Sequence, residues 1–287
     1  MIYISTRGYR SKTAAEICNY LINNDIFNIE LSGGLYDKNM LRNLMQFKNI
    51  ICFQPHNYFP PPKTPFVFNL ASLDENISKQ SINHAIKTIQ LSKDLNCSRY
   101  SFHAGFLLDP KVNELGKRIS NRFINDRSEG IKRFLNNIYT ISKKAEELNI
   151  SLLIENNVLS AENYKEFSAD PLLMTTPEES VYILENTPDN VNMLIDVAHL
   201  KVSSNTLGYA AVDMLQACDP WIKAYHFSDN DGLSDSNDTF DEKAWFWPFI
   251  KHDLDYYSIE VYNINIKEVK KLISLVKTKL NHKVAID

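Results

Sequence analysis

Six short apolar segments of this chain run into a histidine or an acidic residue at or near their end. These residues are His56, His103, Glu155, Asp196, His226 and Glu260. In a (β/α)8 barrel the C-terminal ends of successive parallel strands meet at one face, so side chains at those positions converge. A buried carboxylate or imidazole needs a partner, which makes six of them hard to explain as packing. The pattern predicts a metal-centred site at one end of a barrel.

Apolar segments alternate with amphipathic segments along the whole chain, as in parallel sheets whose strands are connected by helices. The predicted strands are 2–6, 26–31, 50–54, 99–103, 151–155, 192–196, 223–227 and 256–260, and the predicted helices are 11–24, 74–95, 126–148, 176–186, 206–217 and 265–280. Eight strands in a chain near the usual length of about 250 residues predict a single-domain (β/α)8 TIM barrel over 1–287. No glycine-rich phosphate-binding motif follows any of these strands, which argues against a nucleotide-binding domain.

Three long loops each follow a strand that ends in a candidate ligand. They are 55–66, which leads into a short apolar run at 66–70, then 156–175, and 228–250. Loops after barrel strands lie on the face that carries the active site, so these segments are expected to shape a substrate pocket.

Charge and composition narrow the classes of partner. The formal net charge is −4, and the 228–250 loop carries six acidic residues, so a nucleic-acid partner is not expected. No apolar run approaches the roughly 18 residues that span a bilayer, and the N-terminal segment does not resemble a secretory signal. The four cysteines form no CxxC pair. We expect a cytoplasmic protein with reduced thiols and no membrane partner.

The candidate ligands combine carboxylates with imidazole. Asp196 lies three residues before His199, so both side chains reach one pocket if a helical turn begins there. A mixed oxygen and nitrogen set suits Mn²⁺, Mg²⁺, Co²⁺ or Zn²⁺. The alternatives are salt-bridged barrel carboxylates and hydrogen-bonded core histidines. His56 and His103 leave three roles open: metal ligand, substrate contact or structural donor.

Four segments at the strand ends resemble the xylose-isomerase-like TIM-barrel superfamily: IEN at 154–156, IDVAH at 195–199, YHFSDNDG at 225–232 and SIEVY at 258–262. That group includes sugar isomerases and 3-epimerases, inosose dehydratases and metal-dependent AP endonucleases, and the resemblance extends from His56 to Glu260. It implies that one divalent ion is held by four residues, namely Glu155, Asp196, His226 and Glu260. It also implies that His199 contacts the substrate and that the two glutamates are the acid/base pair.

The chain departs from these relatives at two places. Gly232 stands near the position where ketose epimerases carry an arginine. Asp235-Ser236-Asn237 stands where AP endonucleases carry Asp-x-His, and an asparagine is a poorer Zn²⁺ ligand than a histidine.

We therefore predict a metal-dependent isomerase or epimerase that acts on a sugar, a sugar phosphate or a polyol through an enediolate. The alternatives are a phosphodiesterase of AP-endonuclease type and a non-catalytic barrel that keeps the metal site. Further predicted substrate contacts are His56, His103, Asn156 and Trp245. The aromatic group at 245–249 predicts a pocket wall, a subunit contact in a homo-oligomer, or an anchor for its loop.

Overall fold

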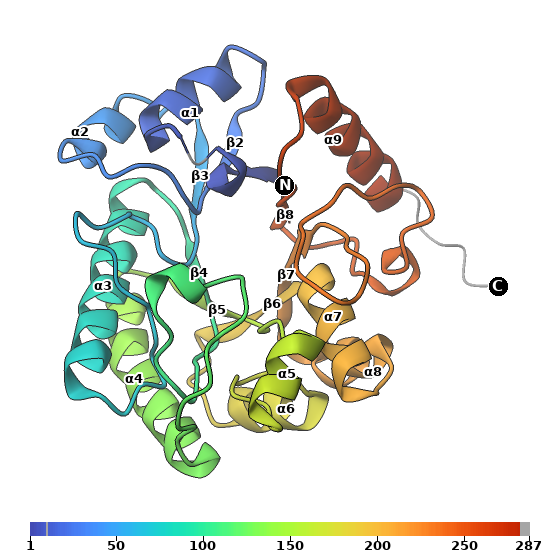
Figure 1. Ribbon diagram of the computed structural model, residues 1–287. Helices are drawn as coiled ribbons and strands as arrows, with labels where there is room; N and C mark the ends of the chain where they lie inside the picture. Colours follow the sequence, from blue (N-terminus) through green and yellow to red (C-terminus); the bar gives the residue numbers. More distant parts are fainter. Residues whose placement is uncertain (10, 282–287) are drawn as a thin grey trace.

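The computed structural model describes residues 1–9 and 11–281, so residue 10 and residues 282–287 of the predicted domain lie outside it. Within the described residues, eight parallel strands form the barrel predicted from the sequence (Figure 1). They are β1 (Ile2–Ser5), β2 (Asn28–Leu31), β3 (Cys52–Pro55), β4 (Arg99–His103), β5 (Ser151–Glu155), β6 (Val191–Asp196), β7 (Ile222–Phe227) and β8 (Tyr257–Ile259).

The sheet runs in the order β3-β2-β1-β8-β7-β6-β5-β4, which leaves β3 and β4 to close the barrel. The β4 and β5 strands pair along five residues, from Arg99 opposite Ser151 to His103 opposite Glu155. By contrast, a single parallel bridge between His56 and Ser101 joins the β3 side to β4 among the described residues. The barrel is therefore nearly closed, with a thin seam between β3 and β4.

Helices surround the strands in Figure 1 and cover their outer faces. They are α1 (Ala14–Ile22), α2 (Met40–Met45), α3 (Glu75–Asp94), α4 (Arg127–Glu147), α5 (Ala161–Phe167), α6 (Pro177–Glu185), α7 (Val197–Leu207), α8 (Ala211–Ala217) and α9 (Ile266–Asn281). Their starts follow the expected chemistry: the Thr176 side chain accepts a hydrogen bond from the Glu179 amide, and Pro177 occupies the first turn of α6.

The prediction of one helix over 206–217 was wrong, because two helices occupy this part of the chain. Asp196 caps α7 directly at the end of β6, since its Oδ1 accepts hydrogen bonds of 2.8 Å from the amides of Ala198 and His199. Gly208 then ends α7 in a left-handed conformation with φ of 78°, which glycine adopts without steric cost. The helical turn after Asp196 thus starts earlier than the amphipathic pattern indicated.

Alternation along the strands places the candidate ligands inside the barrel. Leu153, Leu194 and Ala224 form a small apolar cluster with Tyr3 and Tyr256, separate from the larger core between strands and helices. Side chains two residues apart on a strand share a face. The residue two positions beyond each of the first three is Glu155, Asp196 and His226, respectively. The candidate ligands therefore form the next layer above an apolar floor.

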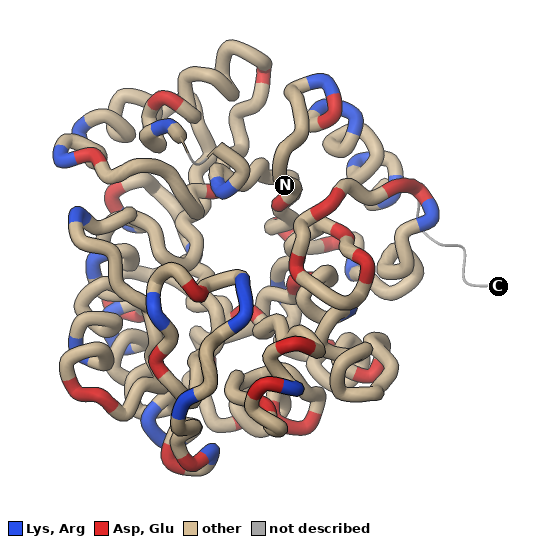
Figure 2. Tube along the Cα trace, viewed as in Figure 1, with Lys and Arg blue, Asp and Glu red and all other residues tan. Residues whose placement is uncertain are grey.

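Long segments follow the strand ends on the face that carries these ligands. The predicted loops at 55–66, 156–175 and 228–250 lie there, although α5 forms inside the second and the run at 66–70 is not a strand. A fourth long segment, 104–126, was not predicted. Figure 2 shows acidic residues recurring along the 228–250 loop. In the part of the chain that the structure describes, no helix is long and apolar enough to cross a membrane.

Candidate metal centre

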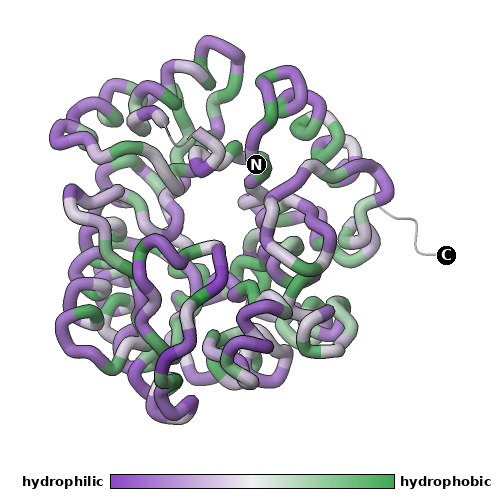
Figure 3. Tube along the Cα trace, viewed as in Figure 1, coloured by the Kyte–Doolittle hydropathy of each residue, from purple (hydrophilic) through white to green (hydrophobic). Residues whose placement is uncertain are grey.

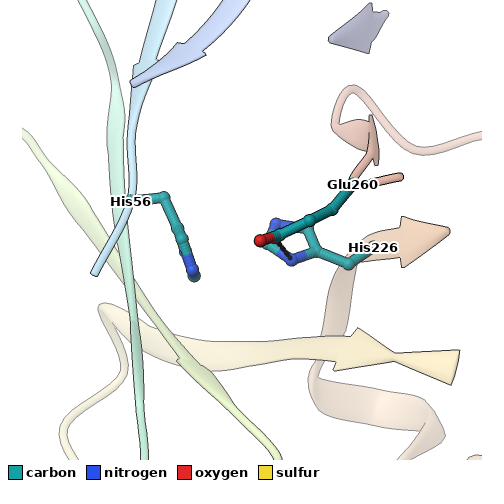
Figure 4. A group of neighbouring side chains, drawn as sticks. All are labelled: His56, His226 and Glu260. Carbon is teal, nitrogen blue, oxygen red and sulfur yellow. Dashed lines mark ion pairs between the residues drawn. The ribbon is translucent and has the colours of Figure 1, made fainter. Parts of the chain in front are cut away.

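Three carboxylates from three strand ends surround one nitrogen atom of His226. The Nδ1 atom of this histidine lies 3.4 Å from an oxygen of Glu155, 3.8 Å from one of Asp196 and 3.2 Å from one of Glu260. Figure 4 shows Glu260 and His226 together, with His56 pointing toward them from the opposite side of the view. The structure thus brings the four predicted metal ligands together.

Several of these atoms are buried and lack a hydrogen-bond partner among the described residues. They are both carboxylate oxygens of Glu155, Oδ2 of Asp196 and Nδ1 of His226. Buried polar atoms in native proteins are nearly always paired, because an unpaired one costs desolvation energy. Glu155, Asp196 and His226 offer ligand atoms that all lie within 4.8 Å of one another. The chemistry and spacing of this donor set fit a divalent cation.

Glu30 supports His226 from the side away from the carboxylates. The Nε2–H of His226 donates a 2.8 Å hydrogen bond to Oε2 of Glu30, and the Tyr256 hydroxyl donates to the same oxygen at 2.6 Å. A carboxylate behind a histidine fixes the orientation of its ring, and with a cation at the centre the ring would present its Nδ1 lone pair to that cation. Glu30 was not predicted from the sequence. Its signal was a lone acidic residue inside the apolar run 26–31.

A hydrogen-bond chain extends from Glu30 to the β3–β4 seam. The Tyr256 hydroxyl also lies 3.3 Å from Ser101 Oγ, which lies 3.0 Å from Nδ1 of His56. This contact turns the other ring nitrogen of His56 toward Glu155, at 3.3 Å. One buried chain therefore positions two histidines on opposite sides of the centre.

Glu155 joins two groups of ligands. Its Oε1 faces His226, whereas its Oε2 lies 3.3 Å from His56 Nε2 and 3.2 Å from His103 Nδ1. His56, His103 and Glu155 form a second set of ligand atoms within 4.8 Å of one another. These two groups share Glu155, and a third group of the described residues, His56, His226 and Glu260, overlaps both of them.

His199, on the first turn of α7, borders the same centre. Its Nδ1–H donates to the backbone carbonyl of Asn156 at 3.1 Å, and its Nε2 lies 3.3 Å from Asp235 Oδ2. From the sequence, Asp235 stood out only as the start of the segment at the Asp-x-His position of AP endonucleases. Its contact with His199 was not predicted, because the strand pattern does not reveal the path of this loop. Nearby, the Asn237 side chain donates to Ser228 Oγ at 3.3 Å.

The two glutamates experience opposite electrostatic effects. Burial raises the pKa of Glu155 to about 7, although His226 opposes the shift. Burial also acts to raise the pKa of Glu260, but hydrogen bonding and charge attraction from His226 lower it below the usual value. Burial lowers the pKa of His103 to about 3. For His226 burial lowers the pKa, yet Glu30 and Glu155 outweigh it and the net shift is upward.

Two residues predicted to contact the substrate are placed otherwise. The Asn156 amide donates to the Asp196 carbonyl at 3.1 Å and accepts from the Asp196 N–H at 2.8 Å, so it fixes the backbone of a candidate ligand. Trp245 packs edge-on against Phe246 and does not line the cavity that opens above the centre. The structure therefore brings His56, His103 and His199 to the centre, but not Trp245.

A cavity of about 330 Å³ opens above the centre, within the range of small-molecule sites. Its inner end is lined by His56, His103, His199, Asp235 and Glu260. Its walls come from the loops after β3, β4, β5 and β7. The loop at 104–126, absent from the sequence prediction, supplies one of these walls.

The sequence matches the family described as "Xylose isomerase-like TIM barrel" over residues 29–278. No curated protein matches the chain. Among solved structures, a D-tagatose 3-epimerase-like protein superposes with a TM-score of 0.71 and 17% identity, covering 99% of both chains. An L-ribulose 3-epimerase superposes with a TM-score of 0.66 and 15% identity, and the match covers 97% of this chain and 95% of that one. A probable 3-DHS dehydratase from Bacillus anthracis superposes with a TM-score of 0.60 and 16% identity, and the match covers 97% of both chains. The family match spans most of the chain, which therefore belongs to the xylose isomerase-like TIM-barrel family.

Proposed function

We propose that this protein is a divalent-metal-dependent isomerase or epimerase that acts on a sugar, a sugar phosphate or a related polyol. One observation carries the proposal: a single histidine nitrogen lies within 3.2–3.8 Å of three carboxylates at the inner end of a cavity. Buried carboxylate and imidazole atoms without partners also argue against a non-catalytic barrel.

Glu155, Asp196, His226 and Glu260 would hold the ion. A divalent ion bound there supplies Lewis-acid polarisation of a substrate carbonyl. The protein side chains fix the geometry: Glu30 orients His226, and the first turn of α7 orients Asp196. With both ligands held from behind, the site is organised before the substrate arrives.

We assign Glu155 and Glu260 as the acid/base pair. One glutamate removes the proton from the carbon beside the carbonyl, which gives an enediolate, and the other returns a proton. Environments that push two carboxyl pKa values apart are typical of such pairs. In the metal-free protein the pKa of Glu155 is raised to about 7 and that of Glu260 is lowered, so their surroundings distinguish the two carboxyl groups.

Three histidines are placed to bind substrate oxygens. His56, His103 and His199 all line the cavity beside the carboxylates. The pKa values of His56 and His103 are lowered by burial, so both rings are neutral near pH 7 and each has one donor and one acceptor nitrogen. Such rings suit the hydroxyl groups of a polyol. The sugar 3-epimerases among the similar structures act on substrates of this class.

The test is solvent-deuterium incorporation across a panel of ketoses, aldoses and polyol ketones, with metal-loaded protein. We expect label at one carbon of at least one substrate, with exchange lost in Glu155→Gln and Glu260→Gln. Asn205→Asp serves as a control variant, because Asn205 contacts Gly232 outside the cavity lining. Unchanged labelling in both glutamine variants would remove the acid/base assignment.

A second candidate is a phosphodiesterase of AP-endonuclease type. It is favoured by the second ligand group at His56, His103 and Glu155, and by the approach of His199 to Asp235. Two features weigh against it. Asn237 is a poor zinc ligand, and the acidic 228–250 loop repels the phosphate backbone of DNA. About one ion per chain and intact abasic DNA support the isomerase; two or more ions with strand cleavage support the phosphodiesterase.

A further inference from the structure

The outer part of the cavity has an apolar wall built from the long loops that follow the strands. Two of these loops supply its side chains: the loop after β3 contributes Tyr58, Phe66 and Phe68, and the loop after β4 contributes Phe106, Leu115 and Ile119. Tyr58, Phe66 and Phe106 are only partly buried, and Leu115 keeps 38% of its surface exposed. Phe68 and Ile119 are buried in the packing of the loops, whereas the other four side chains keep surface that can contact a ligand. Figure 3 shows hydrophobic residues interspersed with hydrophilic ones along the loops at this end of the barrel.

Two amide side chains beside this wall are already engaged with the backbone. The Asn157 amide donates to three carbonyls, those of Ala104, Gly105 and Leu173, at 2.9–3.1 Å. Asn163 accepts from the Ile119 amide at 2.9 Å and donates to the Lys117 carbonyl at 3.2 Å. These amides hold the loops in place.

Glu114 is engaged in the same way. The Arg122 guanidinium donates to it at 2.6 Å, and the Lys111 amide donates at 2.7 Å. The charged residues Lys117, Arg118 and Glu162 also border the cavity, but they are exposed at its rim. Among the residues beside the outer wall, Glu114, Asn157 and Asn163 are therefore not free to pair with a buried hydroxyl.

A substrate that carried hydroxyl groups along its whole length would leave some of them unsatisfied here. Burying a hydroxyl without a partner costs free energy, whereas an apolar group gains free energy on leaving water. The inner end of the cavity, with its histidines and carboxylates, favours hydroxyl groups over apolar ones. The cavity is therefore divided into a polar inner end and an apolar outer wall.

We propose that the natural substrate is amphipathic: a hydroxy-carbonyl unit with an apolar substituent, rather than a free monosaccharide. The hydroxy-carbonyl unit occupies the inner end beside Glu155 and Glu260. The substituent lies against the aromatic wall formed by Phe66, Phe68 and Phe106. This inference rests on the proposed function, because it takes the inner end as the reacting end.

The test compares two probes that share a chelating head group. Acetohydroxamic acid and benzohydroxamic acid differ only in a methyl or a phenyl group, and calorimetry with the metal-loaded full-length protein gives both dissociation constants. We expect the phenyl compound to bind roughly tenfold more tightly or better, because its ring is withdrawn from water. Equal affinities would overturn the proposal.

Variants of the apolar wall test whether this wall causes the preference for the phenyl compound. Leu115→Ser and Phe106→Ala are expected to reduce the phenyl preference several-fold, without affecting the affinity of acetohydroxamic acid. Leu41→Ser is the matched control, since Leu41 on α2 is 42% exposed, much like Leu115, but does not line the cavity. A preference that survives in both cavity variants, or falls equally in the control, contradicts the assignment. The proposed function fails separately, if no compound shows deuterium exchange while the phenyl preference stands.

Discussion

The two halves of the barrel contribute to the centre in different ways. The half from β5 to β8 supplies the three carboxylates and His226, which meet around one nitrogen atom. The half from β1 to β4 supplies Glu30 and the two histidines at the seam. Within that second half, the described residues show only one bridge between the β3 side and β4. The three carboxylates of the centre thus all come from the β5–β8 half, away from the β3–β4 seam.

The difference shows how one half of a barrel can carry the residues proposed to react while the other half carries the residues that position them. In the β5–β8 half, unpartnered oxygens point into the centre, as a cation requires. In the other half, Glu30 acts through His226, and the pKa values of His56 and His103 are lowered by burial so that their rings stay neutral. Changes in the first half should therefore remove the chemistry, whereas changes in the second should weaken it by degrees.

The largest effect is expected for Glu155→Gln. Both oxygens of Glu155 face histidines at the centre, and its loss removes a ligand and a proton-transfer group together. We expect proton exchange to fall by about 10³-fold or more, within or above the usual contribution of general acid–base catalysis. Deuterium incorporation by mass spectrometry measures it. A loss no greater than that of the seam variant His103→Asn would break the contrast between the halves.

Glu30→Gln is expected to weaken the metal affinity by about 10- to 100-fold, the usual effect of removing a carboxylate behind a metal-binding histidine. Equilibrium dialysis with a competing chelator measures the affinity. Tyr256→Phe, which removes a 2.6 Å donor to Glu30, is the milder companion variant. Unaltered affinity in both would show that the β1–β4 half does not position His226.

His103→Asn tests the seam. If His103 binds a substrate hydroxyl, we expect KM to rise by about tenfold, the effect of losing one or two hydrogen bonds, with a smaller change in kcat. Elemental analysis accompanies the kinetics. A fall from two bound ions to one in this variant would instead favour the phosphodiesterase.

The metal-free protein should show a pH-dependent difference in stability between wild type and Glu155→Gln. Burial raises the pKa of Glu155 from 4.5 to about 7, so the folded state binds its proton more tightly than the unfolded state does. This contribution is complete below about pH 4.5 and is lost as the pH rises through 7. Relative to wild type, the variant should gain a few degrees in melting temperature between pH 4.5 and 8. A constant difference across that window would contradict the raised pKa.

The smallest effect is expected for Trp245→Phe. Trp245 packs against Phe246 and lies outside the cavity lining, so KM should change by less than about twofold, as for most substitutions away from such features. Phe106→Ala, from the apolar wall, is the comparison. A large rise in KM for the tryptophan variant would restore the role that the sequence suggested.

Much of the fold and part of the centre could be predicted from the sequence, because strand identity and side-chain alternation are local properties. The eight strands, the helix start at Thr176 and the convergence of Glu155, Asp196, His226 and Glu260 follow from where apolar runs end. A helical turn after Asp196 was raised only as a condition for Asp196 and His199 to share a pocket, and no helix was predicted there, because the amphipathic pattern begins at 206.

Only the tertiary structure could reveal which distant groups lie behind and above the ligands. Glu30 is 196 residues from His226 in sequence, and the contact between them depends on how the barrel closes. The approach of Asp235 to His199 and the wall from 104–126 depend on loop paths that no periodic pattern encodes. The amino-acid sequence by itself determined which side chains point into the barrel. Closure and loop packing decided their partners, because contacts between distant segments are set by the geometry of the whole sheet.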